Sequence, residues 1–95
     1  MREEIAIKGE KKAIETYLWY YKMILDGTGI GAIEPESLIT LAIVQGEMQR
    51  IIPDIEIERV IANKAIEIIK NDEYPFLKYN PAENMIYKLS LKGDA

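Results

Sequence analysis

Hydrophobic and polar residues alternate with a helical period in three stretches of the chain and with a period of two in a fourth. Across residues 10–26, apolar side chains recur at steps of three and four residues and form a broad stripe. Helical patterns also cover residues 35–51 and the isoleucine-rich residues 54–72. Residues 76–92 have the pattern of a β-hairpin. The sequence therefore predicts an α+β fold of three helices followed by a C-terminal β-hairpin.

The prediction of the hairpin depends on residues 85–92. One face of this segment carries Met85, Tyr87, Leu89 and Leu91, and the other carries Ile86, Lys88, Ser90 and Lys92. Alternation over eight residues is typical of a half-buried strand. Between the two strands, Pro81 presets φ for the first corner of a type I turn, and Asn84 tolerates the left-handed conformation needed to leave it.

Several residues mark the expected ends of the elements. Gly27 is placed to be the left-handed residue after the first helix, and Ala32-Ile33 has the pattern of a short strand. Pro35 suits the first position of the second helix, and Asp54 suits the N-cap of the third. Gly46 either interrupts the second helix or lies inside it, and the sequence leaves both interpretations open.

The 95 residues predict a single domain, because a second core would have too little chain to close around. Residues 1–9 are expected to form an arm or a short strand ahead of the first helix. The expected core consists of Ile14, Leu18, Tyr21, Leu25, Leu38, Leu41, Ala42, Val60, Ile61, Ile68, Leu77, Tyr87 and Leu89.

Helix, short strand, helix, turn, helix and hairpin is the element order of a winged helix. From about Ala13 to Leu91 the chain resembles the winged helix-turn-helix superfamily in this order and in its hydrophobic pattern. The resemblance implies a three-helix winged-helix-like domain with a C-terminal hairpin as its wing. It also suggests a regulator that contacts DNA through the third helix and the wing.

Composition argues against catalysis. The chain contains no histidine and no cysteine, so it lacks the commonest general base, the commonest zinc ligand and any thiolate. Gly27, Gly29 and Gly31 follow a helix instead of a strand, which is the wrong context for a phosphate loop. Asp54, Glu56 and Glu58 are explained by the preference for acidic residues at the start of a helix. We expect no enzyme activity, cofactor, metal or small-molecule substrate.

Two features predict a cytoplasmic protein. The charged start, residues 1–4, leads into no apolar segment of the kind found in signal peptides. The longest uncharged run, residues 37–46, is far shorter than the ~20 residues needed to span a bilayer.

The charge distribution weakens the case for DNA binding. The chain has 12 basic and 16 acidic side chains, for a net charge of −4. Residues 31–72, the expected helix-turn-helix, contain four basic and eight acidic side chains, so the net negative charge falls where DNA would dock. The alternative surface for DNA comprises Arg59, Asn63, Lys64, Lys70, Lys78 and Lys88. Arg59 and Asn63 would read bases together with Lys64, and Lys78 and Lys88 would contact phosphates.

The first helix is apolar on nearly every side. Tyr17 and Tyr21 fall on its inward face, and Trp19, Tyr20 and Met23 are expected on the opposite side. Trp, Tyr and Met are enriched in protein interfaces. This side is therefore expected to meet another protein, most simply a second copy in a homodimer. The alternative is that Ile5 and Ile7 of the N-terminal arm fold over Trp19.

Two functions follow from these patterns. The first is an acidic, non-enzymatic winged-helix module that acts by protein–protein interaction, as an adaptor or regulator of a nucleic-acid machinery. The alternative is a dimeric DNA-binding transcriptional regulator. The charge distribution favours the adaptor, whereas the resemblance favours the regulator.

Overall fold

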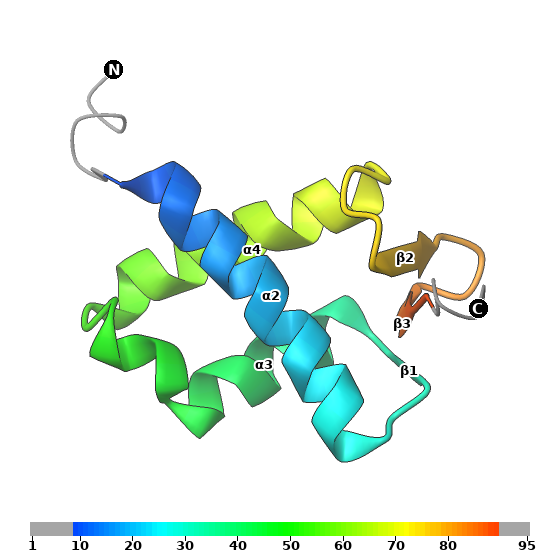
Figure 1. The fold of residues 1–95 in the computed structure, drawn as a ribbon, viewed down its shortest axis with the longest axis horizontal. Coiled ribbons are helices and arrows are strands. Elements are labelled where there is room, and N and C mark those ends of the chain that lie inside the picture. The colour runs from blue at the N-terminus through cyan, green and yellow to red at the C-terminus, as the bar shows by residue number, and fades with distance from the viewer. Residues whose placement is uncertain (1–8, 90–95) are drawn as a thin grey trace.

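The computed structural model describes residues 9–89, which form three α-helices and a small antiparallel sheet (Figure 1). The elements in order are α2 (Glu10–Thr28), β1 (Ala32–Ile33), α3 (Pro35–Gln45), the 3₁₀-helix η1 (Glu47–Arg50), α4 (Ile55–Lys70), β2 (Leu77–Asn80) and β3 (Met85–Lys88). The α+β fold with a C-terminal hairpin is as predicted. The expected arm over residues 1–8 and the end of the hairpin over residues 90–92 lie outside the described residues.

The helix starts follow the sequence signals. Pro35 occupies the first turn of α3, where its missing N–H costs no helical hydrogen bond. The Asp54 carboxylate caps α4 by accepting from the backbone N–H groups of Glu56 and Ile57, at 2.9 and 3.3 Å. Both predictions are confirmed, and they fix where α3 and α4 enter the bundle.

Gly46 ends the second helix. Its φ of 72° is left-handed, and its N–H donates to the carbonyl of Ile43. Helix α3 therefore stops at Gln45 instead of continuing to residue 51, and η1 follows as a separate turn. Of the two interpretations of Gly46, the one in which it forms the break is the one observed.

The first helix ends later than predicted. Gly29, with φ of 71°, is the left-handed residue, and Gly27 lies inside α2. The hydroxyl of Thr28 donates to the carbonyl of Ile24 at 2.7 Å, which satisfies one of the acceptors of the last turn. A glycine near a helix end does not by itself mark the cap, because glycine is also tolerated in the last turn.

The sheet has the order β1–β3–β2, so β3 is its central strand. The predicted short strand β1 pairs with β3, and β2 and β3 form the hairpin. Asn84 has φ of 55°, so the left-handed exit from the turn is confirmed. The register places Ile33 and Tyr79 opposite Ile86, which makes one apolar face.

That apolar face is the opposite one from our prediction for β3. Ile86 is fully buried, whereas Tyr87 and Leu89, which we expected in the core, are only partly buried. Alternation fixes the period of a strand. It leaves open which face points inward when both faces carry apolar residues.

The core lies where α2 packs on α4, with α3 and the sheet closing its sides (Figure 1). Of the expected core residues, those that are buried are Leu18, Tyr21, Leu25, Leu38, Ala42, Ile61 and Leu77. Ile14, Leu41 and Ile68 pack against this core while partly exposed. Val60 is an error, because it is 43% exposed. The buried stripe of α4 instead runs through Glu58, Ile61, Ala62, Ala65, Ile66 and Ile69.

Candidate functional site

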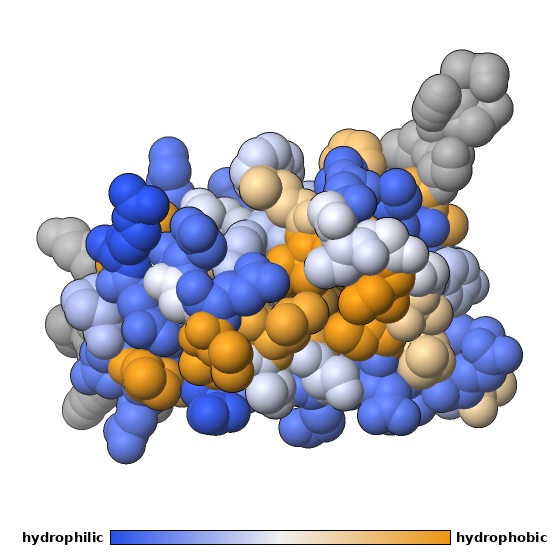
Figure 2. Space-filling model, turned by 90° about the horizontal axis from the view of Figure 1, so that it is seen from below, coloured by the Kyte–Doolittle hydropathy of each residue, from blue (hydrophilic) through white to orange (hydrophobic). Residues whose placement is uncertain are grey.

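Apolar side chains gather in a band across one face of the molecule, seen from the side on which α3 lies (Figure 2). Among residues 9–89, the large hydrophobic residues that are substantially exposed are Trp19, Met23, Val44, Ile51, Ile55, Ile57, Val60 and Phe76. Single exposed apolar residues need no explanation, but residues that border a common hollow indicate a binding surface.

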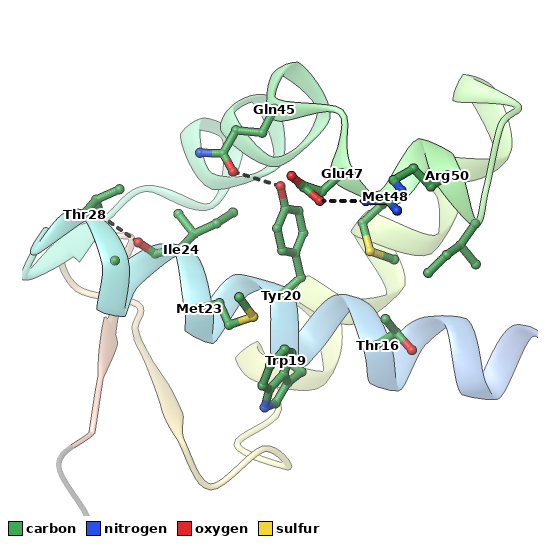
Figure 3. A pocket seen from close by; sticks show the side chains of 12 residues that line it. Thr16, Trp19, Tyr20, Met23, Ile24, Thr28, Gln45, Glu47, Met48 and Arg50 are labelled. Atoms are coloured by element: carbon green, nitrogen blue, oxygen red, sulfur yellow. Dashed lines mark hydrogen bonds and ion pairs between the residues drawn. The ribbon is translucent and has the colours of Figure 1, made fainter.

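Three of these side chains border a hollow of about 880 Å³, which we call the α2 groove. One wall comes from α2 and the other from the end of α3, η1 and the following residue (Figure 3). The lining residues are Thr16, Trp19, Tyr20, Met23, Ile24, Gly27, Thr28, Gln45, Glu47, Met48, Arg50 and Ile51.

On the α2 wall, Trp19 is 57% and Met23 44% exposed. They lie one turn apart, so their side chains share a face of the helix. Figure 3 shows Trp19 projecting from α2 away from Tyr20. These two residues are thus placed on the outward side of α2, as the sequence suggested.

Tyr20 differs from the prediction, because it is 8% exposed and lies between the two walls. Its hydroxyl donates to Oε1 of Gln45 at 2.8 Å, which ties α2 to the end of α3. Burial, reinforced by the negative charge of Glu47, raises the pKa of Tyr20 above its ordinary value of 10.0. Tyr20 therefore stays a neutral donor and forms the floor of the α2 groove instead of an exposed contact.

The opposite wall was missed by the sequence analysis. Met48 is buried in this wall, whereas Ile51 is 62% exposed. Glu47 and Arg50 form an exposed ion pair of 3.9 Å at the rim. Gly46 was the signal that could have found this wall, because the break there separates η1 from α3, and η1 lines the hollow opposite α2. The sequence pattern alone could not place a four-residue turn beside a helix thirty residues earlier.

Glu58 is the one charged side chain that is buried within residues 9–89. Its Oε2 accepts from the hydroxyl of Tyr17 at 3.0 Å, and its Oε1 has no hydrogen-bond partner in the described part of the chain. Burial, and then the charge of Glu58, raises the pKa of Tyr17, which keeps the hydroxyl protonated. The three acidic side chains at the start of α4 therefore have different surroundings. Asp54 caps the helix, Glu56 faces solvent and Glu58 points into the core.

Most of the residues expected to contact DNA make side-chain contacts with other residues of the chain. Ion pairs join Lys64 to Glu10, Lys78 to Asp72 (3.5 Å) and Lys88 to Asp26 (2.7 Å). The side chain of Asn63 donates to the carbonyl of Arg59 at 3.0 Å, and Lys70 lies 5.3 Å from the centre of the Tyr79 ring. Arg59 faces solvent on α4.

No protein-family model, curated protein or solved structure matches the chain. The likeness to the winged helix-turn-helix superfamily thus stays a prediction from element order. Over residues 9–89, no group of three acidic side chains is placed to hold a metal ion. None of the helices in that range combines the length and apolar character that crossing a membrane requires.

Proposed function

We propose that the protein is a non-enzymatic interaction module that binds another protein through the α2 groove. The observation that carries this proposal is the exposure of Trp19, Met23 and Ile51 around one hollow. With its winged-helix-like element order, the module would act in the cytoplasm as an adaptor or regulator of a nucleic-acid machinery.

Burial of the groove would supply the driving force. Fully covering an apolar side chain of this size contributes about 1.5–3 kcal/mol, and Trp19, Met23 and Ile51 are each about half exposed in the monomer. Aromatic residues and Met concentrate at the centres of protein interfaces. The buried ring of Tyr20, held by Gln45, gives the partner a fixed floor, which lowers the entropy lost on binding.

Binding of DNA through α4 and the hairpin has less support. Three of the lysines that would neutralise phosphates are already paired with carboxylates, namely Lys64, Lys78 and Lys88. A phosphate would have to compete with those carboxylates, and the net charge of −4 opposes the approach of DNA.

Site-specific photocrosslinking tests the proposal. A photoreactive amino acid replaces Met23 in the groove or, as a matched control, Val44, which is exposed on α3 outside the groove. The full chain is irradiated in an extract of its source organism, and the adducts are identified by mass spectrometry. We expect specific adducts from position 23 that are absent from position 44 and are lost when Ile51→Glu is added.

Equal labelling from both positions, or labelling that survives Ile51→Glu, would refute the α2 groove as the binding surface. Titration with random-sequence duplex DNA tests the alternative. Binding that weakens steeply with salt and is unchanged by Ile51→Glu would assign the function to α4 and the hairpin.

A further inference from the structure

The first half of α4 buries a charged residue and exposes apolar ones. Glu58 is fully buried, whereas Ile55, Ile57 and Val60 are between 36% and 47% exposed. Burying a carboxylate is costly, and leaving isoleucine or valine in water gives up the free energy that their burial would contribute. The side chains of these turns therefore oppose the position that the turns occupy in the fold.

The second half of α4 has the ordinary pattern of a packed helix. Ala65, Ile66 and Ile69 are buried, and Glu67 and Lys70 face solvent. Regions of one fold that differ in this way open with different free energies, and the region with fewer buried apolar side chains opens more easily. The first half of α4 is therefore held less firmly than the second.

A single hydrogen bond from the described residues holds Glu58 in its buried position. The Tyr17 hydroxyl donates to Oε2 at 3.0 Å, and Oε1 is buried without a partner among residues 9–89. If Glu58 moved outward, water would solvate both oxygens, which offsets the loss of the hydrogen bond from Tyr17.

The segment that leads into α4 is incompletely packed against α2. A hollow of about 700 Å³ separates the first turns of α2 from residues 51–54, Ile57 and Ile61. Residues 51–54 are a turn and a loop between η1 and α4, so no regular backbone hydrogen bonding continues through them. A segment that is bordered by a loop and backed by a hollow can move with little loss of packing.

We propose that residues 51–60, which we call the α4 latch, open and close as a unit while the rest of the fold stays intact. In the open arrangement the hydrogen bond between Tyr17 and Glu58 is broken, and the Glu58 carboxylate lies in water. Because Ile51 also lines the α2 groove, opening removes part of one wall of that groove. The latch is a property of the chain alone, so its test does not depend on the proposed function.

Native-state hydrogen exchange, measured by NMR at several urea concentrations below the unfolding transition, tests the latch. In α4, the amides of residues 59–62 donate to carbonyls of the latch, whereas those of residues 66–69 donate to carbonyls outside it. We expect the protection of the first set to be at least about tenfold lower and nearly independent of urea, because local opening exposes little surface. The second set should depend strongly on urea, as expected for unfolding of the whole domain.

Equal protection of the two sets, with the same dependence on urea, would overturn the latch, because the two halves of α4 would then open only together. This comparison uses the wild-type chain, so it decides the point even if a variant fails to fold.

Substitutions at the buried pair separate the latch from ordinary fraying of a helix end. Glu58→Met replaces the buried carboxylate by an apolar side chain and should raise the protection of residues 59–62 about tenfold. Tyr17→Phe removes the hydrogen bond that holds the latch closed and should lower their protection. Glu56→Met is the matched control, because Glu56 lies in the same turns but faces solvent, and it should leave their protection nearly unchanged.

Two results would show that the start of α4 frays while Glu58 stays buried, and either would overturn the inference. One is protection of residues 59–62 that responds to neither Glu58→Met nor Tyr17→Phe. The other is a response to Glu56→Met as large as that to Glu58→Met.

Discussion

Glu58 places a carboxylate in the core with a single hydrogen bond from the residues that the structure describes. The Tyr17 hydroxyl donates a hydrogen bond to Oε2 of Glu58, while Oε1 of Glu58 is buried with no partner among the described residues. Buried carboxylates are costly unless they are fully hydrogen-bonded. The Tyr17–Glu58 pair therefore contributes to the geometry of the α2–α4 contact more than to its stability.

Removing the Tyr17 hydroxyl should lower the stability of the fold, because Glu58 then loses this hydrogen bond. Tyr17→Phe keeps the ring but leaves both oxygens of Glu58 unpaired, and we expect it to lower the free energy of unfolding by about 1–3 kcal/mol. Adding Glu58→Met should restore most of the loss, because no buried polar group is then left unpaired. Urea unfolding of the single and double variants measures this. A double variant as unstable as Tyr17→Phe would contradict the explanation.

The buried tyrosines should also limit stability at high pH. Burial raises the pKa of Tyr17 and of Tyr21 above the ordinary value of 10.0. Their contribution to stability is complete below the unfolded value and is lost as the pH rises past it, because only the unfolded state releases the protons.

In an alkaline titration followed by tyrosinate absorbance, we therefore expect at least Tyr17 and Tyr21 to ionise together with the loss of helical circular dichroism. Tyr17→Phe should remove one of them from this cooperative step. Ionisation of all six tyrosines while the helices persist would contradict the burial of Tyr17 and Tyr21.

Glu58 also shows why the buried stripe of α4 was only partly predicted from the sequence. The helix has isoleucine or valine on several sides, and a charged residue at the start of the true stripe argues for the opposite face. We expected both Val60 and Ile61 in the core, and of these two only Ile61 is buried. A hydrophobic pattern does not predict the burial of a charged side chain that has a specific hydrogen-bond partner, because that partner lies far away in the sequence.

At the scale of elements, the boundaries with a local chemical cause were predictable. Pro35, Asp54 and Asn84 act through their own backbone or side chain, and all three behave as expected. The exposed side of α2 was predictable for Trp19 and Met23. The groove beside it was not, because its second wall depends on how η1 packs against α3 and α4, which no local signal determines.

The two glycines at the end of α2 give a matched test. Gly29 has a left-handed φ and Gly27 does not, and an added Cβ at either position meets no other atom within 4 Å. Gly29→Ala should cost about 1–2 kcal/mol of stability because of its backbone conformation. Gly27→Ala should instead stabilise by about 0.4–1 kcal/mol by restricting the unfolded chain.

Thermal unfolding of the two variants under identical conditions measures these changes. Opposite shifts in Tm are expected, with the Gly27→Ala protein above the wild type. Shifts of the same sign would place the end of α2 at a different residue.

At the scale of the whole molecule, Asp26 links the first described helix to the last strand. Its carboxylate accepts hydrogen bonds from Lys88 of β3 at 2.7 Å and from Lys22 of α2 at 3.0 Å. The hydrogen bond from Lys88, and then that from Lys22, lowers the pKa of Asp26 below its ordinary value of 3.8.

A lowered pKa stabilises the fold above the unfolded value, and this contribution is lost as the pH falls through the folded value. Asp26→Asn should therefore lower Tm at neutral pH, and the difference from the wild type should vanish in strong acid. Solvent exposure keeps the effect small. Lys88→Met should reduce the effect of Asp26→Asn. An equal effect in both backgrounds would mean that the α2–β3 ion pair does not form.

The pairing of Tyr17 with Glu58, and of Tyr21 with the Ala62 carbonyl, joins residues 41 positions apart in the chain. During synthesis α2 leaves the ribosome before α4, and the helix that covers its aromatic face is complete only at Lys70. A nascent chain that stalls after α3 would expose Tyr17, Leu18 and Tyr21 together. Translation pauses in this interval should therefore produce a species that chaperones bind, whereas pauses after α4 should not.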